Sequence, residues 1–366
     1  VTGVQTCALP ISSGPPGTNY SVMKKAFDEG WGGVICKTLS LDASVVHNVT
    51  PRYAQIRSHA EQEIMGWENI ELISDRPFET MLEDLKRLRD DYPDRVLMAS
   101  IMEQYKREAW EEIIERVEAT GIDGLEINFS CPHGLPEMGM GMAMGQHPEV
   151  LKEVCGWISE KATVPVWAKM TPNITDITQP SRQALMAGCD GISAINTITS
   201  VTGVDLETLK PQPSVYGYTT LGGYSFKAIK PIALAHVQKI AKLIQEEFNG
   251  DKSLSGIGGV ENGRDAAEHL LLGANTVQVC TGIMVHGYSM IDKLCGGLQA
   301  FMRKHGFKSI EDFRGAALPY FTTHAELVRI QNEVKAERKA AQRVLITDAD
   351  WTADRFSKEA ESMVSN

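Results

Sequence analysis

The sequence predicts a (β/α)8 barrel, also called a TIM barrel, followed by a C-terminal helical extension. Three observations predict it: short apolar runs alternate with amphipathic segments, several of those segments end in glycine, and 366 residues leave room for eight such units. Seven apolar runs are expected to be strands, at residues 33–38, 96–102, 124–130, 165–171, 191–197, 253–259 and 276–283. Each run is apolar on both faces, as in parallel strands that helices cover.

Amphipathic helical segments separate these runs. They are expected at residues 77–90, 106–120, 148–161, 180–187, 231–248 and 263–272. Gly121, Gly188 and Gly273 follow three of them, where glycine commonly ends a helix. A further strand near residues 11–14 would complete a ring of eight. A doubly wound sheet is the alternative, but no G-x-G-x-x-G follows the first strand.

The chain is expected to divide into three parts. Residues 1–11 look like a non-native leader, which would leave the first barrel strand truncated, although a genuine lead-in to that strand is the alternative. Residues 12–318 would form the barrel. Residues 319–366 would form a helical tail, with a charged helix at 325–344.

Composition argues against several classes of protein. The net charge of −11 argues against a uniformly basic surface, and no apolar run approaches the roughly 18 residues that span a bilayer, so neither nucleic acid nor membrane is expected as a partner. The seven cysteines include no C-x-x-C pair. We therefore expect no metal site, no iron–sulfur cluster on this chain, and a cytoplasmic protein with reduced thiols.

Polar residues gather where the expected strands end, which is the face that carries the active site in barrel enzymes. They are Lys37, Thr38, Ser100, Asn128, Ser130, Cys131, Lys169, Asn196 and Thr197. This set predicts a polar, planar ligand held by many hydrogen bonds. Lys169 lies in an apolar run and needs an anionic partner, either a ligand or a structural carboxylate. Cys131 begins a Gly- and Met-rich loop, where a thiol can be an acid–base group or simply semi-buried.

Glycines end the seventh and eighth runs, at Gly258-Gly259 and at Gly282 after Cys280-Thr281. Backbone N–H groups can approach an anion there, and the corresponding loops are a recurrent phosphate site in barrels. Tight turns without a ligand are the alternative, and Cys280 by itself suggests packing. Two long connections, at residues 48–74 and 201–224, are expected to be functional loops.

Several segments together resemble the dihydropyrimidine dehydrogenases, within the flavin barrel that these share with the dihydroorotate dehydrogenases. The matching segments are residues 69–74 (NIELIS), 99–102 (ASIM), 128–134 (NFSCPHG), 139–141 (GMG), 145–146 (GQ), 168–176 (AKMTPNITD), 195–197 (INT), 222–225 (GGYS) and 230–234 (KPIAL). The resemblance runs from about residue 12 to about residue 315. His133-Gly134 and the NIELIS segment favour the dihydropyrimidine branch.

The resemblance implies an FMN site and a pyrimidine site at the mouth of the barrel. FMN would be held by Lys37, Thr38, Asn128, Lys169, Gly223, Gly258, Gly259, Cys280 and Thr281. Uracil or thymine would be held by Asn69, Glu71, Asn128, Ser130, Asn196 and Thr197. Hydride would pass from FMN N5 to C6 of the pyrimidine, and Cys131 would deliver a proton to C5.

The resemblance also implies an indirect supply of electrons. Long members of the family carry Cys-rich iron–sulfur segments, but the last cysteine here is Cys295 and no cluster motif exists. We therefore expect NAD(P)H to act through an FAD-containing partner subunit, and we expect an oligomer. The alternatives are dihydroorotate oxidation, which Glu71 would disfavour by repelling a carboxylate, a non-redox phosphate-binding barrel, and a non-catalytic fragment.

Overall fold

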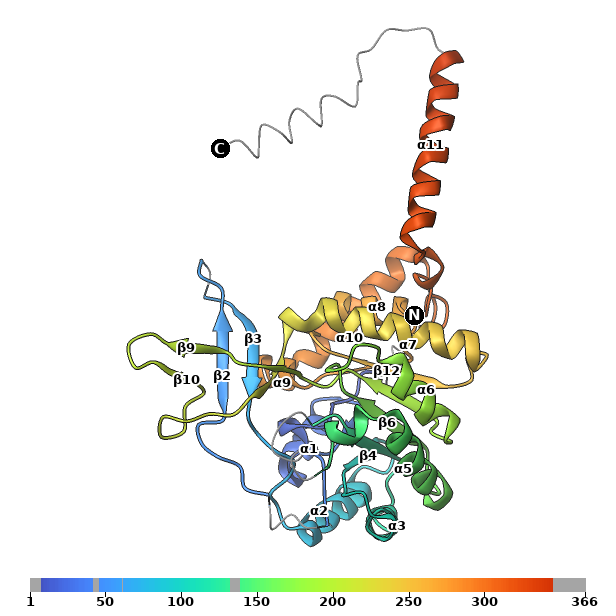
Figure 1. The fold of residues 1–366 in the computed structure, drawn as a ribbon. Helices are drawn as coiled ribbons and strands as arrows, with labels where there is room; N and C mark the ends of the chain where they lie inside the picture. Colours follow the sequence, from blue (N-terminus) through green and yellow to red (C-terminus); the bar gives the residue numbers. More distant parts are fainter. Residues whose placement is uncertain (1–7, 42–45, 61, 132–138, 345–366) are drawn as a thin grey trace. The chain divides into compact units, whose positions relative to one another are not determined.

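Seven parallel strands form one sheet in the order β1-β4-β5-β6-β7-β12-β13 (Figure 1). They are β1 Gly33–Ile35, β4 Val96–Ile101, β5 Gly124–Phe129, β6 Val166–Met170, β7 Gly191–Ala194, β12 Ser253–Ile257 and β13 Thr276–Gln278. This computed structural model describes residues 8–41, 46–60, 62–131 and 139–344. Ile11 pairs in parallel with Val34 on one side and with Val279 on the other. Ile11 thus takes the place of the eighth strand and closes the sheet into the predicted barrel.

Helices follow the barrel strands in turn. They are α1 Tyr20–Asp28, α2 Phe78–Asp91, α3 Arg107–Glu118, α5 Pro148–Lys161, α6 Thr178–Met186, α7 Lys230–Glu247, α8 Gly263–Leu271 and α10 Met290–His305. The six helices expected between the strands are present, whereas α1 and α10 were not predicted. The run at 276–283 was wrongly predicted to be all strand, because β13 ends at Gln278 and Thr281–His286 is the short helix α9. Periodicity cannot divide so short an apolar run.

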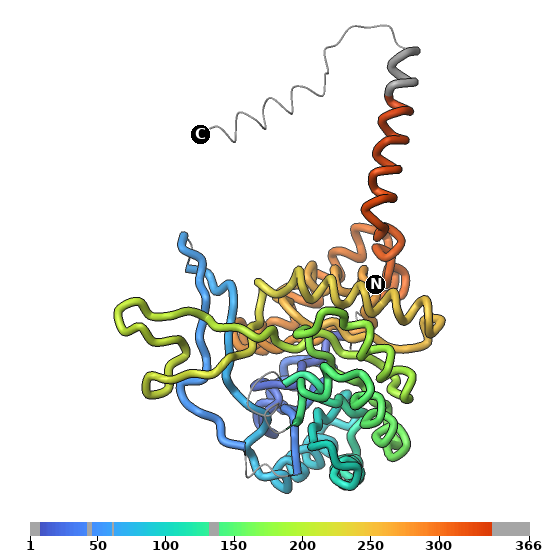
Figure 2. Tube along the Cα trace, in the orientation of Figure 1, coloured from blue at the N-terminus to red at the C-terminus, as the bar shows by residue number. Residues whose placement is uncertain are grey.

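A second, antiparallel sheet comes from the two long connections. Its order is β2-β3-β11-β8, with β2 Tyr53–Arg57, β3 Ile64–Asn69, β11 Gly222–Ser225 and β8 Ile198–Ser200. A hairpin of β9 Gly203–Asp205 and β10 Lys210–Gln212 extends from it. Figure 2 shows these segments, far apart in sequence, side by side at one flank of the barrel. The sequence predicted two long functional loops here but did not predict that they carry strands.

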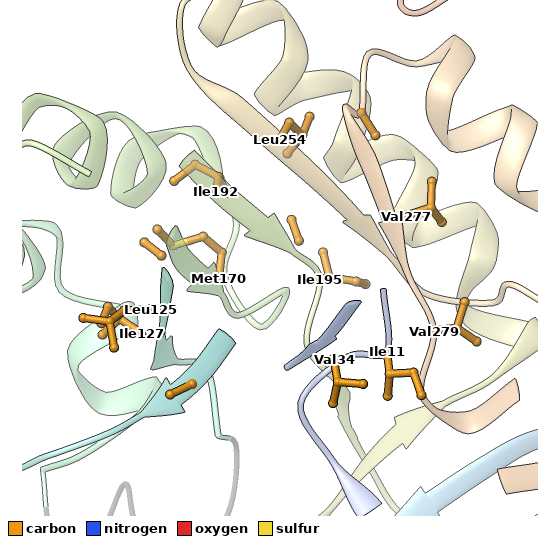
Figure 3. Close-up of a cluster of buried hydrophobic side chains, with 14 of the residues drawn as sticks. Ile11, Val34, Leu125, Ile127, Met170, Ile192, Ile195, Leu254, Val277 and Val279 are labelled. Atoms are coloured by element: carbon orange, nitrogen blue, oxygen red, sulfur yellow. The ribbon is translucent and has the colours of Figure 1, made fainter. Parts of the chain in front are cut away.

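The barrel strands alternate between apolar and polar residues. Leu125 and Ile127 of β5 belong to the buried apolar layer, which continues through neighbouring strands (Figure 3). Glu126 and Asn128, which alternate with them, are equally buried but make polar contacts. Gln278 of β13 donates a hydrogen bond to Glu126 at 2.9 Å, although β5 and β13 are not neighbours in the sheet. This bond crosses the barrel, so the expectation of strands apolar on both faces was wrong for β5.

Helices α8 and α10 approach each other at a glycine. A Cβ atom added to Gly263 would lie 2.2 Å from the backbone nitrogen of Leu298, so only glycine fits at this contact. Asn262 and Asp265 form a capping box that fixes the start of α8. Gly296 of α10, in contrast, has no neighbouring atom within 4 Å of the same added position.

The segment from Pro319 onward forms a second unit, distinct from the unit that ends at Leu318. It contains α11, His324–Val344, where the charged helix was expected. Arg329 of α11 forms ion pairs with Glu326 and Glu333 on the same helix. None of the helices in the described part of the chain has both the length and the apolarity needed to cross a membrane.

Candidate active site

A cavity with about 1080 Å³ of empty space, part of which opens to solvent, lies at the C-terminal ends of the barrel strands. Asn128 of β5, Lys169 of β6 and Gln278 of β13 line it from the barrel. Tyr53 and Trp67 line it from the antiparallel sheet.

Most of the residues predicted to form the site line this cavity. They are Lys37, Thr38, Asn69, Glu71, Asn128, Cys131, Lys169, Asn196, Thr197, Gly258, Gly259, Cys280 and Thr281. They come from segments distributed over most of the barrel sequence. The parallel arrangement of the strands therefore brings the predicted set together.

Ser130 and Gly223 do not line the cavity in the described part of the chain. Ser130 is fully buried, and both its hydroxyl and its backbone N–H donate to Asn128 Oδ1, at 2.9 and 3.0 Å. A Cβ atom on Gly223 would lie 2.2 Å from Thr197 Oγ1. Ser130 therefore orients Asn128, and the lack of a side chain at Gly223 makes room for Thr197, while direct ligand contact by either residue stays a prediction.

Hydroxyl groups hold the Asn128 amide on its other side. Asn128 Nδ2 donates to Thr38 Oγ1 at 3.0 Å, and Thr38 Oγ1 lies 2.8 Å from Ser100 Oγ. The Oδ1 of Asn128 is fixed by Ser130, so the donor and acceptor ends of the amide are defined. One hydrogen of Nδ2 remains for a ligand acceptor.

Lys169 has an anionic partner within the protein. Its ammonium lies 3.3 Å from Glu126 Oε1, 3.1 Å from Ser12 Oγ and 2.9 Å from Ser13 Oγ. Both members of the ion pair are almost fully buried. The structural carboxylate, one of the two alternatives for Lys169, is therefore present. Glu126 was not predicted as a site residue, although it stands two positions before Asn128 and thus on the same face of β5.

Lys37 and Glu71 form a second buried ion pair. Lys37 Nζ lies 2.6 Å from Glu71 Oε1, and Tyr53 donates a hydrogen bond to Glu71 Oε2 at 2.6 Å. Arg52 Nε lies 3.5 Å from the same carboxylate. Two cations offset the charge of Glu71, so the argument that Glu71 would repel a substrate carboxylate was wrong. Burial and the bond to Glu71 raise the pKa of Tyr53, which keeps its hydroxyl protonated.

Cys131 lies just after β5 in a small apolar cluster at the cavity wall. The cluster consists of Val46, Ile73, Met102, Cys131 and Met140. Gly141 has a φ of 58°, and a Cβ atom there would approach Cys131 Cβ to 3.1 Å. Glycine at position 141 therefore permits close packing against the Cβ atom of Cys131. His133 and Gly134, which contributed to the family resemblance, lie outside the described residues.

The glycines after β12 have two consequences. Gly258 and Gly259 have φ values of 127° and 74°, which favour glycine, and a Cβ atom on Gly259 would lie 2.4 Å from Lys230 Cβ. Glycine therefore permits packing against the start of α7 as well as access to the backbone.

The buried His269 ring contacts Gly258 O at 3.1 Å through Nε2. Burial lowers the pKa of His269 to about 4, so the ring is neutral near pH 7.

Cys280 and Thr281 complete this side of the cavity. Ser225 Oγ and Thr281 Oγ1 lie 2.9 Å apart and connect β11 to the start of α9. Burial raises the pKa of the Cys280 thiol to about 11, so it stays protonated. Across the described ranges, no group of three His, Cys, Asp or Glu side chains is arranged to hold a metal ion.

Comparisons with known proteins agree with this geometry. The family model described as dihydroorotate dehydrogenase matches residues 10–302. The chain is 64% identical over 360 residues to the chloroplastic dihydropyrimidine dehydrogenase (NADP(+)) of Arabidopsis thaliana, covering 97% of this chain and 84% of the relative. It is 41% identical over 307 residues to the NAD-dependent dihydropyrimidine dehydrogenase subunit PreA of Escherichia coli K12, covering 84% and 73%.

A solved structure supports the fold. A crystal structure of DHODH from Eimeria tenella in complex with ferulenol aligns with a TM-score of 0.68 and 20% identity, covering 84% of this chain and 85% of that one. This likeness shows the fold alone and confirms the predicted fold class. Because the family model covers most of the chain and both sequence relatives are similar over most of their length, the chain belongs to the dihydroorotate dehydrogenase family, and within it to the dihydropyrimidine dehydrogenases.

Proposed function

We propose that this protein reduces uracil and thymine to their 5,6-dihydro forms with FMN as cofactor, a step of pyrimidine catabolism. The observation that carries the proposal is the single cavity wall on which Lys37, Asn128, Cys131 and Lys169 meet. Lys37 follows β1, Asn128 and Cys131 lie in and just after β5, and Lys169 lies in β6, and a non-redox barrel would give these residues no joint purpose. The two relatives named dihydropyrimidine dehydrogenase support the same reaction.

The residues present fit FMN. Lys37 and Lys169 supply ammonium groups beside the cavity, and the fixed Nδ2 of Asn128 supplies a donor for the ring. The backbone around Gly258, Gly259, Cys280 and Thr281 would bind the phosphate, Thr38 would contribute from the cavity lining, and Gly223 would support the site from behind. When bound, FMN would supply a hydride from N5 to C6 of the pyrimidine.

The pyrimidine would lie between the amide side chains and the thiol. Asn69 Nδ2 donates to Gly223 O at 3.2 Å, so its Oδ1 can accept a ring N–H. Glu71, Asn128, Asn196 and Thr197 would complete the contacts, with Ser130 acting through Asn128. Cys131 would donate a proton to C5 as negative charge develops there.

Electrons would reach this chain from NAD(P)H through a partner subunit that holds FAD. The Escherichia coli relative is named as a subunit, which supports an assembly of this kind. An oligomer and a cytoplasmic location remain predictions, and the Arabidopsis relative is named as chloroplastic.

Dihydroorotate oxidation is the rival reaction on the same barrel. With Glu71 offset by Lys37 and Arg52, electrostatic repulsion does not disfavour it. Sequence identity to the two dihydropyrimidine dehydrogenases is what favours pyrimidine reduction.

The test is a half-reaction that requires no partner subunit. Purified protein should be yellow and should release FMN on denaturation. The protein is first reduced with dithionite under anaerobic conditions. Uracil should then reoxidise the flavin, and the return of flavin absorbance near its visible maximum measures this reaction. Reoxidation by orotate but not by uracil would replace the proposal with the rival reaction.

A further inference from the structure

Glu126 is fully buried and does not line the cavity, yet its carboxylate is held from three directions. Ser13 donates to Oε1 at 2.9 Å, and Lys169 lies 3.3 Å from the same oxygen. Gln278 donates to Oε2 at 2.9 Å. Donors therefore reach both oxygens of the buried Glu126 carboxyl group.

The bonds to Glu126 tie together distant parts of the barrel. Gln278 of β13 also donates to Ser193 of β7 at 3.2 Å, while Ser13 follows the segment that closes the ring. The carboxylate is thus fixed relative to three strands and to the N-terminal segment. Lys169 receives its position from the same network, because Ser13 contacts both charged groups.

A buried ion pair of this kind is a poor way to stabilise a barrel. Desolvation of both charges opposes their attraction, and well-packed apolar residues of similar volume often serve as well or better. The location of the pair suggests another purpose, since Lys169 lines the cavity and Glu126 stands behind it.

We propose that Glu126 is a positioning residue that holds the Lys169 ammonium at the cavity wall and offsets its charge, so that it lowers the reduction potential of the bound flavin. The inference rests on the proposed FMN site. An uncompensated cation beside the flavin stabilises its reduced, anionic form and makes that form a weaker hydride donor. The carboxylate limits this effect while keeping the ammonium in place.

The experiment measures the midpoint potential of the bound FMN by anaerobic titration against a reference dye. Glu126→Gln keeps the shape of the side chain but removes its charge, so the potential should shift to a more positive value than in the unaltered protein. Glu103→Gln is the matched control, because Glu103 is also buried and accepts hydrogen bonds from Ser40 and Leu41 but lies outside the cavity lining. The control should leave the potential unchanged.

A double variant identifies the route of the effect. In a Lys169→Met background there is no ammonium for Glu126 to hold or offset, so Glu126→Gln should shift the potential less than it does in the unaltered protein. A shift of equal size in both backgrounds would overturn the role assigned to Lys169. An unchanged potential in Glu126→Gln with FMN bound would overturn the inference as a whole and leave Glu126 with a packing role.

A conservative variant covers the case in which Glu126→Gln does not fold or load FMN. Glu126→Asp keeps the charge but withdraws it by one methylene group, so a smaller positive shift is expected, and no shift would contradict the inference. Failure of the unaltered protein to bind FMN would instead contradict the proposed function. The two failures are therefore distinguishable.

Discussion

Asn128 illustrates, at the residue scale, how ligand-facing groups are held in this barrel. Ser130 fixes one end of its amide and Thr38 the other, so the side chain has a defined orientation without a ligand present. Lys37 and Lys169 are held in the same way, each by a buried glutamate. Such preorganisation reduces the cost of ordering the site when a ligand binds.

Cys131 is the residue on which the proposed chemistry depends most directly. Cys131→Ala removes the proton donor, and turnover with uracil should fall about 10²–10⁴-fold, the usual contribution of a positioned acid. FMN content should not change, because the small apolar cluster around the thiol tolerates a methyl group. Steady-state rates and flavin absorbance measure the two quantities.

Cys295→Ala is the matched control for this substitution. Cys295 is partly buried in α10 and does not line the cavity, so the control should retain nearly full turnover. Unchanged turnover in Cys131→Ala would remove the proton-donor assignment, whatever the control shows.

Sequence patterns identified residues that line the cavity better than they identified the partners of those residues. A polar residue at the end of a parallel strand is recognisable from sequence, because all such ends share one face of the barrel. The residues that such a side chain contacts are not recognisable from sequence. The hydrogen bond between Glu126 and Gln278, for example, joins strands that lie far apart in the chain. Tyr53 and Trp67 were also missed. They lie on β2 and β3, which pair with each other locally, in a sheet that continues through β11 and β8.

At the scale of elements, sequence signals that lie within one segment predicted the barrel helices correctly. The strands of the antiparallel sheet gave no such signal. The amphipathic period and the terminal glycines predicted six helices, because both features lie within one segment. The strands of the antiparallel sheet are three to six residues long, and no period can be read from so few residues. Helix α1 carried a recognisable signal in Asn19, whose side chain accepts from Val22 N at its start.

The contact between α8 and α10 supplies a prediction at this scale. Gly263→Ala forces a methyl group against the backbone of α10 and should lower the free energy of unfolding by about 1–3 kcal/mol or more. Gly296→Ala, in open space within α10, should instead raise it by about 0.5–1 kcal/mol, because alanine favours the helix. The free energies of unfolding of the two variants are compared by urea titration, with circular dichroism as the signal. Equal effects of the two substitutions would show that the close approach is absent.

At the scale of the whole molecule, one residue completes the ring of strands. Ile11 is fully buried and pairs with both edges of the seven-stranded sheet. The sequence predicted a strand near this position, but it also placed Ile11 in a suspected non-native leader. In the structure, Ile11 is part of the barrel. That residues 1–11 are a non-native leader stays a prediction.

Ile11→Ala should therefore destabilise the protein. The cavity left by the lost methyl groups should lower the free energy of unfolding by about 2–5 kcal/mol. Ile232→Ala is a matched control, because Ile232 is 45% exposed on α7, and its effect should stay within about 0.5 kcal/mol. Denaturant titrations of the two variants give the comparison, and a loss of similar size in both would contradict closure by Ile11.

Closure by Ile11 also sets an order of events during synthesis. Val34 leaves the ribosome soon after Ile11, but Val279 follows only when nearly the whole barrel has been made. At about 5–20 residues per second, the N-terminal segment waits on the order of ten seconds or longer with one edge unpaired. The nascent chain therefore exposes an open sheet edge until its last strand arrives, and a chaperone that shields that edge would act on this protein before its cofactor can bind.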